Sequence, residues 1–164
     1  MKKKWIKLFD PSINKNEEKA VVKTLKSKFW ASGSGDGNVG KFEKEFKKYL
    51  GSKKCVAVNS GTAALHLALS LIDIKGKEVL LPSLSFASTA HAVLYNGGIP
   101  KFVDVDEKTL CIDPNKIEKK ITQKTKIILP VHFAGMSCKI DKILKICNDN
   151  ELKLIEDAAH ASGT

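Results

Sequence analysis

A strand-to-helix turn is predicted at Asn59-Ser60-Gly61-Thr62-Ala63-Ala64-Leu65. A short apolar run over residues 55–58 leads into this stretch, and an apolar helical pattern follows it. The glycine allows a sharp backbone turn, and the hydroxyls of Ser60 and Thr62 can donate hydrogen bonds. The unpaired N–H groups of the first helical turn would then face any anion placed there. The stretch predicts a phosphate-binding turn or an ordinary N-capped helix, because serine and threonine also favour the N-cap position.

Apolar runs and helical patterns alternate after this turn. Strands are expected near residues 54–58, 78–82, 100–104, 125–130 and 152–156, and helices near residues 62–72, 86–96, 113–121 and 139–149. Such alternation indicates βαβ units, so we expect an α/β fold of three layers, with helices on both faces of a mainly parallel sheet. Before the turn, Asn14 and Glu17 resemble a capping box that begins a helix, and a second helix is expected over residues 39–50.

An acidic residue follows the last expected strand, in the run Leu152-Lys153-Leu154-Ile155-Glu156-Asp157-Ala158-Ala159-His160. The strand delivers Asp157 into small, apolar surroundings, where an unpaired charge is costly. A protonated pyridine nitrogen would be a suitable partner, since this pairing holds pyridoxal phosphate as an electron sink. The turn at residues 59–65 and Asp157 both fall just past carboxyl ends of expected strands, where ligands bind in open α/β sheets.

Seven segments, in order along the chain, resemble the pyridoxal-phosphate sugar aminotransferases of the DegT/StrS type. They are Pro11–Ile13, Phe42–Phe46, Ser60–Leu65, Pro82–Thr89, Phe102–Asp106, Pro130–Gly135 and Glu156–Ala161. The resemblance implies the large domain of a fold-type I aminotransferase, present here incompletely. It places an N-terminal helical segment with a substrate-side glycine loop at residues 1–50, and the first part of the cofactor-binding large domain at residues 51–164.

The resemblance also implies the residues that bind pyridoxal 5'-phosphate. These are Ser60, Gly61, Thr62, Ala63, Phe86, Asp157 and His160. Thr62 and Ala63 would contact the phosphate, and Phe86 would stack on the pyridine ring. Asp157 would act in catalysis by pairing with the ring nitrogen, and His160 would contact the side of the ring that carries the hydroxyl. The family more commonly has glutamine at the position of His160.

The family's Schiff-base lysine lies beyond the equivalent of Asp157, in a segment that reads roughly Ser-Phe-x-x-x-Lys. None of the 164 residues matches that segment, and Lys153 is expected at the opposite end of its strand from the cofactor. We therefore expect the N-terminal part of an enzyme, truncated before its catalytic lysine and its smaller C-terminal domain. Alone, such a chain is expected to be inactive and to associate through uncovered strand edges.

The complete enzyme is expected to move an amino group from an amino-acid donor such as glutamate to a keto-sugar nucleotide, in amino-sugar and polysaccharide biosynthesis. The resemblance implies a homodimer in which both chains contribute to each site. Two alternatives stay open. Some relatives replace the lysine and dehydrate a sugar instead, and a non-catalytic module could bind a phosphate-bearing ligand at the turn.

The net charge of +10 raises the possibility of a nucleic-acid-binding protein. All 28 basic residues are lysine, so bidentate recognition of guanine by arginine is excluded. The lysines are dispersed along expected helix exteriors, as at Lys19, Lys23 and Lys26, which is typical of a solvated surface. We expect no nucleic-acid partner, although a positive field would attract the diphosphate of a nucleotide sugar.

The composition indicates a cytoplasmic protein. No apolar run approaches the roughly 20 residues needed to span a bilayer, and no secretory signal follows the basic start. We therefore expect no membrane partner. The four cysteines show no C-x-x-C spacing, so reduced thiols are expected.

Three other patterns suggest different sites. Residues 35–40 fit G-x-G-x-x-G, but a helix rather than a strand precedes them and no acid follows about 20 residues later, which disfavours a nicotinamide site. Glu156, Asp157 and His160 could bind a metal, but no second ligand cluster supports them, and none is predicted. His66 and His91 fall within expected helices. His132 follows a strand and either lines the cofactor site or packs in the core.

Overall fold

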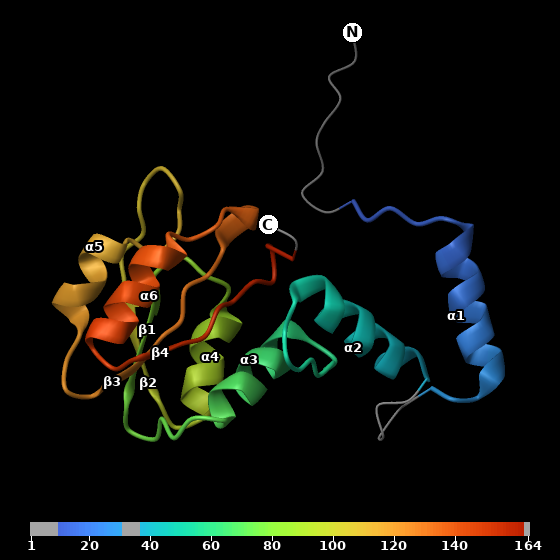
Figure 1. Cartoon of the computed structure of the whole chain (residues 1–164), viewed down its shortest axis with the longest axis horizontal. Coiled ribbons are helices and arrows are strands. Elements are labelled where there is room, and N and C mark those ends of the chain that lie inside the picture. Colours follow the sequence, from blue (N-terminus) through green and yellow to red (C-terminus); the bar gives the residue numbers. More distant parts are fainter. Residues whose placement is uncertain (1–9, 31–36, 163–164) are drawn as a thin grey trace, which may run out of the picture. The chain divides into compact units, whose positions relative to one another are not determined.

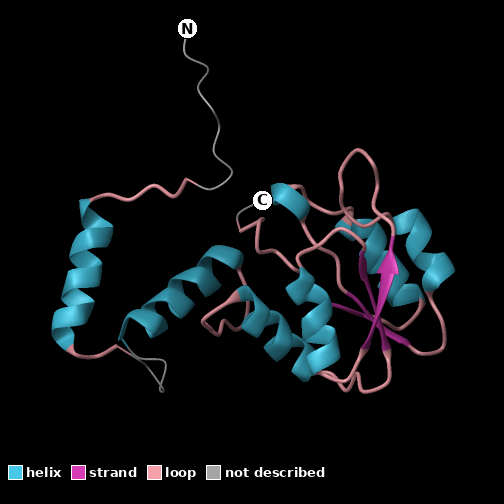
Figure 2. Cartoon of the chain, turned by 180° about the vertical axis from the view of Figure 1, so that it is seen from behind, coloured by secondary structure: helices cyan, strands magenta, loops and turns pink. Residues whose placement is uncertain are grey.

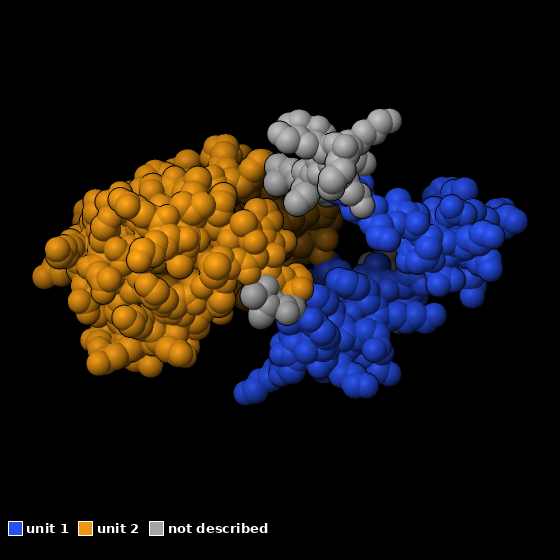
Figure 3. All heavy atoms as spheres, turned by 90° about the horizontal axis from the view of Figure 1, so that it is seen from above, with its two compact units in different colours: residues 1–57 blue, residues 58–164 orange. Residues whose placement is uncertain are grey.

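The computed structural model describes residues 10–30 and 37–162 of the chain. The chain divides into two compact units, residues 1–57 and residues 58–164 (Figure 3). Every helix among the described residues is too short or too polar to cross a membrane. Gly35 and Asp36, the first two residues of the G-x-G-x-x-G pattern, lie outside the described residues.

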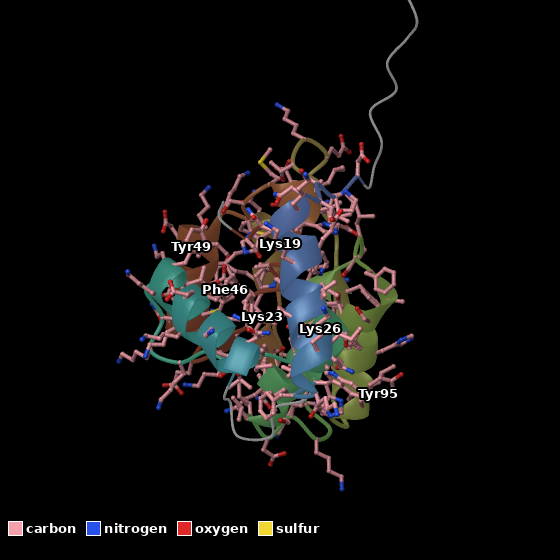
Figure 4. All side chains as sticks on the ribbon, turned by 90° about the vertical axis from the view of Figure 1, so that its right-hand side faces the viewer. Lys19, Lys23, Lys26, Phe46, Tyr49 and Tyr95 are labelled. Atoms are coloured by element: carbon pink, nitrogen blue, oxygen red, sulfur yellow. The ribbon has the colours of Figure 1, made fainter. Side chains whose placement is uncertain are left out.

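The first helix of unit 1, α1, spans Lys15–Ser27 and begins with the predicted capping box. The side chain of Asn14 accepts a hydrogen bond from the N–H of Asn16 at 2.8 Å, and Glu17 accepts one from the N–H of Asn14 at 2.8 Å. These bonds satisfy N–H groups that the helix itself cannot pair. Figure 4 shows three lysines along the exterior of this helix, Lys19, Lys23 and Lys26.

The second helix of unit 1, α2, spans Gly37–Leu50. The rings of Phe42 and Phe46 are stacked with centroids 5.3 Å apart, and Phe46 lies 6.3 Å from Tyr49. Figure 4 shows Phe46 and Tyr49 on the same helix. This apolar face is the one that the helical spacing predicts.

The strand expected near residues 54–58 is not formed. The N–H of Ala57 instead donates to the carboxylate of Glu43, in α2, at 2.8 Å. A strand is stable only when a second strand pairs with it, and an apolar run does not by itself provide that partner. The prediction was therefore wrong for this segment, and an irregular chain leads into the turn at residues 59–65.

Unit 2 contains a four-stranded sheet in the order β2-β1-β3-β4, and every pairing is parallel. Figure 2 shows the strands fanned by the usual twist of a parallel sheet. The strands are β1 at Glu78–Pro82, β2 at Ile99–Val103, β3 at Thr125–Ile128 and β4 at Lys153–Leu154. Four of the five expected strands are thus confirmed, and the last is shorter than residues 152–156.

Helices cover both faces of this sheet (Figure 1). On one face lie α3, Gly61–Ser70, and α4, Ala87–Tyr95. On the other lie α5, Pro114–Ile117, and α6, Ile140–Asp149. The helix expected over residues 113–121 is divided, because α5 continues as the 3-10 helix Glu118–Lys120. The predicted three-layer α/β fold is confirmed.

Alternate residues of the strands build two separate cores, because side chains of a strand point to opposite faces of the sheet. Odd-numbered residues such as Val79 and Ile127 pack with α3 and α4, whereas Leu80 and Ile128 pack with α5 and α6. The central strands β1 and β3 are buried over most of their length, as is usual when helices cover both faces of a parallel sheet, whereas the outer strands β2 and β4 are more exposed. The polar side chains that could bind a ligand therefore lie at the ends of the strands.

Candidate functional site

The predicted turn is the N-terminus of α3. Ser60 is the N-cap, and its hydroxyl oxygen accepts a hydrogen bond from the N–H of Ala63 at 3.1 Å. The carbonyl of Ser60 accepts from the N–H of Ala64 at 3.0 Å. Within the described part of the chain, no acceptor binds the N–H groups of Gly61 and Thr62. Ser60 therefore caps the helix, and the two following amides are left to bind an anion.

Gly61 forms the turn without a left-handed backbone conformation. Its φ lies outside the left-handed region, and a Cβ built on it would meet no atom within 4 Å. A methyl side chain at this position would therefore meet no steric obstacle in the protein. The glycine instead keeps space open beside the two free amides.

Asp157 continues the sheet just beyond the end of β4. Its N–H donates to the carbonyl of Pro130 at 2.9 Å, and its carbonyl accepts from the N–H of His132 at 3.1 Å. Val131 and Asp157 thereby form a parallel bridge. The backbone of Asp157 is fixed at the carboxyl edge of the sheet, where the apolar strand pattern predicted it.

The carboxylate of Asp157 is held by neutral groups. Oδ2 accepts from the hydroxyl of Thr89 at 3.0 Å, and Oδ1 accepts from the N–H of Ala159 at 3.2 Å. Among the described residues, no lysine or histidine forms an ion pair with it. The negative charge is therefore oriented but not neutralised, so a cationic group bound beside it would be favoured.

His160 approaches the same place from the loop after Asp157. Its Nδ1 accepts the N–H of Ala134 at 3.2 Å, and its ring meets the edge of Phe133 with centroids 6.2 Å apart. Because a backbone amide can only donate, Nδ1 carries no hydrogen. The neutral ring of His160 therefore carries its hydrogen on Nε2, which is the remaining donor.

These groups surround one cleft of about 470 Å³ in unit 2. Phe86, at the N-cap of α4, contributes an aromatic ring that is 80% exposed. Of the predicted site residues, Ser60 and Ala63 support the turn without lining the cleft. The cleft is lined by Gly61, Thr62, Leu65, Ser85, Phe86, Ser88, Phe133, Asp157, Ala159 and His160.

His132 does not line this cleft; it packs in the core. Its Nε2 lies 2.9 Å from Oε2 of Glu156, and its Nδ1 accepts the N–H of Cys138 at 3.1 Å. The amide again fixes the tautomer, so Nε2 donates to Glu156. Of the two expectations for His132, packing in the core is the one that the structure shows, because its buried ring holds Glu156.

Among the described residues, no three His, Cys, Asp or Glu side chains are grouped so that they could hold a metal ion. His66 and His91 are exposed on α3 and α4, with ring centroids 6.1 and 6.0 Å from that of Tyr95. Neither belongs to the residues that line the cleft.

Sequence reasoning missed the hydroxyls behind Asp157. Thr89 is fully buried, and its hydroxyl lies 2.6 Å from that of Ser85. The only signal in the sequence was that both residues belong to the segment rich in hydroxyl side chains that follows β1, Ser83–Thr89. Nothing in that run indicated a partner 68 positions along the chain.

Comparisons with known proteins find similarity along most of the chain. The family model described as DegT/DnrJ/EryC1/StrS aminotransferase family matches residues 11–164. The spore coat polysaccharide biosynthesis protein SpsC of Bacillus subtilis (strain 168) is 47% identical over 152 residues, which cover 92% of this chain and 38% of that protein. A GDP-perosamine synthase of Caulobacter vibrioides is 42% identical over 154 residues, which cover 93% of this chain and 41% of that protein.

The chain thus spans about 40% of the length of the curated relatives that it matches. Among solved structures, a GDP-4-keto-6-deoxymannose-3-dehydratase with a trapped PLP-glutamate geminal diamine has a TM-score of 0.85 and 31% sequence identity. That match covers 94% of this chain and 41% of the dehydratase chain.

Proposed function

Because the chain belongs to the DegT/DnrJ/EryC1/StrS aminotransferase family, we propose that its cleft is the pyridoxal 5'-phosphate site of an aminotransferase that acts on keto-sugar nucleotides. The observation that carries this proposal is the convergence of four features in one cleft. They are the free amides of α3, the exposed ring of Phe86, the carboxylate of Asp157 and the donor on His160.

The N-terminus of α3 fits a phosphate group. The N–H groups of Gly61 and Thr62 are without acceptors in the described chain, and the helix dipole adds a partial positive charge there. The space left beside Gly61 matters only if something fills it, because the protein itself does not. Both features support a bound anion over a plain N-cap.

The part of the cleft lined by Phe86, Asp157 and His160 fits a flat, cationic ring. The aromatic ring of Phe86 is 80% exposed and lines the cleft, so it supplies a stacking surface. Asp157 would hold the proton of a pyridinium nitrogen, and the cofactor, when bound, supplies an electron sink for cleavage of bonds next to an amino group. The hydrogen on Nε2 of His160 would bind an oxygen substituent of the ring.

No lysine is among the residues that line the cleft. We propose that the amine which binds the cofactor covalently is not one of the described lysines, so these residues bind and orient the cofactor without attaching it. The homodimer, the amino-acid donor and a cytoplasmic location belong to the same proposal. The net charge of +10 would favour an anionic nucleotide-sugar substrate.

A sugar dehydratase of the same family is the second candidate. The similarity to the GDP-4-keto-6-deoxymannose-3-dehydratase, at a TM-score of 0.85, supports it. The cleft residues described above bind and orient the cofactor, and both reactions require that. Assays of the full-length protein with a keto-sugar nucleotide and glutamate separate the two, because only the transferase gives an amino sugar.

Binding of pyridoxamine 5'-phosphate tests the proposed site, because this form of the cofactor cannot react with surface lysines. We expect saturable binding to the chain, and weaker binding of pyridoxamine, which lacks the phosphate. The variant Gly61→Ala should fold normally, since its Cβ meets no protein atom. It should lose at least about tenfold in affinity for the phosphorylated ligand only, roughly the value of a charged hydrogen bond. Equal affinities of wild type and Gly61→Ala would contradict the proposed phosphate position, and absence of any binding would contradict the proposed function.

A further inference from the structure

Thr89 occupies an unusual position for a hydroxyl-bearing side chain. It lies in the first turn of α4, and it is fully buried between the helix and the sheet. A buried hydroxyl without a hydrogen-bond partner would be costly, so the partners of Thr89 indicate its structural role. Its hydroxyl oxygen lies 3.0 Å from Oδ2 of Asp157 and 2.6 Å from the hydroxyl of Ser85.

The directions of these two bonds follow from the hydrogens available. A carboxylate can only accept, so the single hydroxyl hydrogen of Thr89 goes to Asp157. The hydroxyl of Ser85 has two possible acceptors, the hydroxyl of Thr89 at 2.6 Å and the carbonyl of Phe86 at 3.2 Å, and it donates to the nearer one, Thr89. The result is a directed chain from Ser85 through Thr89 to Asp157, in which each bond strengthens the next.

This chain determines how the carboxylate of Asp157 is turned. The terminal torsion of an aspartate is broad, so the backbone position alone does not orient its oxygens. The N–H of Ala159 holds Oδ1 and Thr89 holds Oδ2, which fixes the carboxylate plane. Each oxygen keeps a second lone pair for a ligand in the cleft.

We propose that Thr89 is a positioning residue, which orients the carboxylate of Asp157 toward the ring nitrogen of the bound cofactor. The proposal rests on the proposed function, because it assigns Asp157 to that nitrogen. Thr89 does not itself contact the ligand, since it is not among the residues that line the cleft. It acts only through Asp157.

Two ligands separate this role from a general effect on packing. One is pyridoxamine 5'-phosphate, and the other is its analogue with a carbon atom in place of the ring nitrogen. Both carry the same phosphate and nearly the same shape, but only the first can bind Asp157. Their affinities are measured for wild type, for Thr89→Val, which keeps the shape without the hydroxyl, and for the matched control Thr89→Ser, which keeps the hydroxyl.

In Thr89→Val, the preference for the nitrogen-containing ligand should fall about tenfold, the usual effect of losing one hydrogen bond to a charged group. In Thr89→Ser it should stay within about twofold of wild type. An unchanged preference in Thr89→Val would overturn the proposal, as would an equal loss of affinity for both ligands in both variants.

Crystal structures of the wild type and of Thr89→Val without ligand test independently whether Thr89 orients Asp157. We expect the carboxylate of Asp157 to rotate away from its wild-type orientation in Thr89→Val. An unmoved carboxylate would overturn the positioning role. If wild type binds neither ligand, the proposed function fails, and these structures still decide whether Thr89 orients Asp157.

Discussion

Glu156 and Asp157 are adjacent in the sequence, but their carboxylates have different partners. Oε2 of Glu156 lies 2.9 Å from Nε2 of the buried His132, whereas Oδ2 of Asp157 binds Thr89 beside the cleft. Consecutive residues of an extended chain point in opposite directions, so one carboxylate serves the core and the other the site. This relationship makes the two residues a matched pair for mutagenesis.

Asp157→Asn should weaken binding of pyridoxamine 5'-phosphate by about tenfold or more, because it removes the charge that holds the ring proton. Glu156→Gln should leave that affinity within about twofold but lower the free energy of unfolding by about 1 kcal/mol, through the weakened bond to His132. Ligand titration and denaturant unfolding measure the two effects. The assignment of Asp157 is wrong if both variants bind the ligand equally well.

The chain should form no single stable adduct with pyridoxal phosphate, because no lysine lines the cleft. After borohydride reduction, peptide mapping should find scattered, substoichiometric labelling of surface lysines. Wild type and Gly61→Ala should give the same pattern. One stoichiometric adduct near the turn at residues 59–65, dependent on Gly61, would show that the chain supplies its own amine.

The four cysteines are free thiols, and they should react at very different rates. Burial raises the pKa of Cys138 to about 12 and that of Cys147 to about 11. At about pH 8 both therefore keep their protons, and the thiolate is the reactive form. Cys55 is only half-buried and should be alkylated first by iodoacetamide, as followed by mass spectrometry. If Cys138 is labelled as fast as Cys55 in the folded chain, the burial of Cys138 is contradicted.

Glu78 should make the stability depend on pH. The hydroxyl of Thr122 donates to it at 2.7 Å and lowers its pKa, and Lys101, at 3.1 Å, adds to this. A lowered pKa means that the stabilisation is present above the ordinary value of 4.5 and is lost as pH falls through the lowered value. Denaturant unfolding should show a smaller acid loss for Glu78→Gln than for wild type. Identical pH profiles would exclude this contribution.

The purified chain should self-associate. Within residues 10–30 and 37–162, β2 and β4 each pair with a single strand, and Phe102 on β2 is 50% exposed. Open strand edges with exposed apolar side chains pair readily with other chains. Size exclusion with light scattering should show oligomers, and Phe102→Lys should reduce them. A sharp monomer peak with a cooperative thermal transition for the wild type would refute this expectation.

Much of the fold could be predicted from local patterns. The alternation of apolar runs and helical spacing gave four strands, their parallel arrangement and the helices on both faces. The helix start at Asn14 and the cap at Ser60 depend on neighbouring residues alone, and both were predictable. The failure at residues 54–58 has the opposite cause, since a strand needs a partner that its own residues do not specify.

In the candidate site, too, some features follow from local sequence and others depend on distant partners. By itself, the sequence determined that the turn at Ser60 and the acid at Asp157 would stand at strand ends, because the period of apolar residues specifies where each element begins and ends. Only the tertiary structure decided which side chains meet there. Thr89 reaches Asp157 across 68 positions, and His132 turns to Glu156 instead of the cleft. Such pairs depend on how helices dock on the sheet and on strand register, which are properties of the whole packed core.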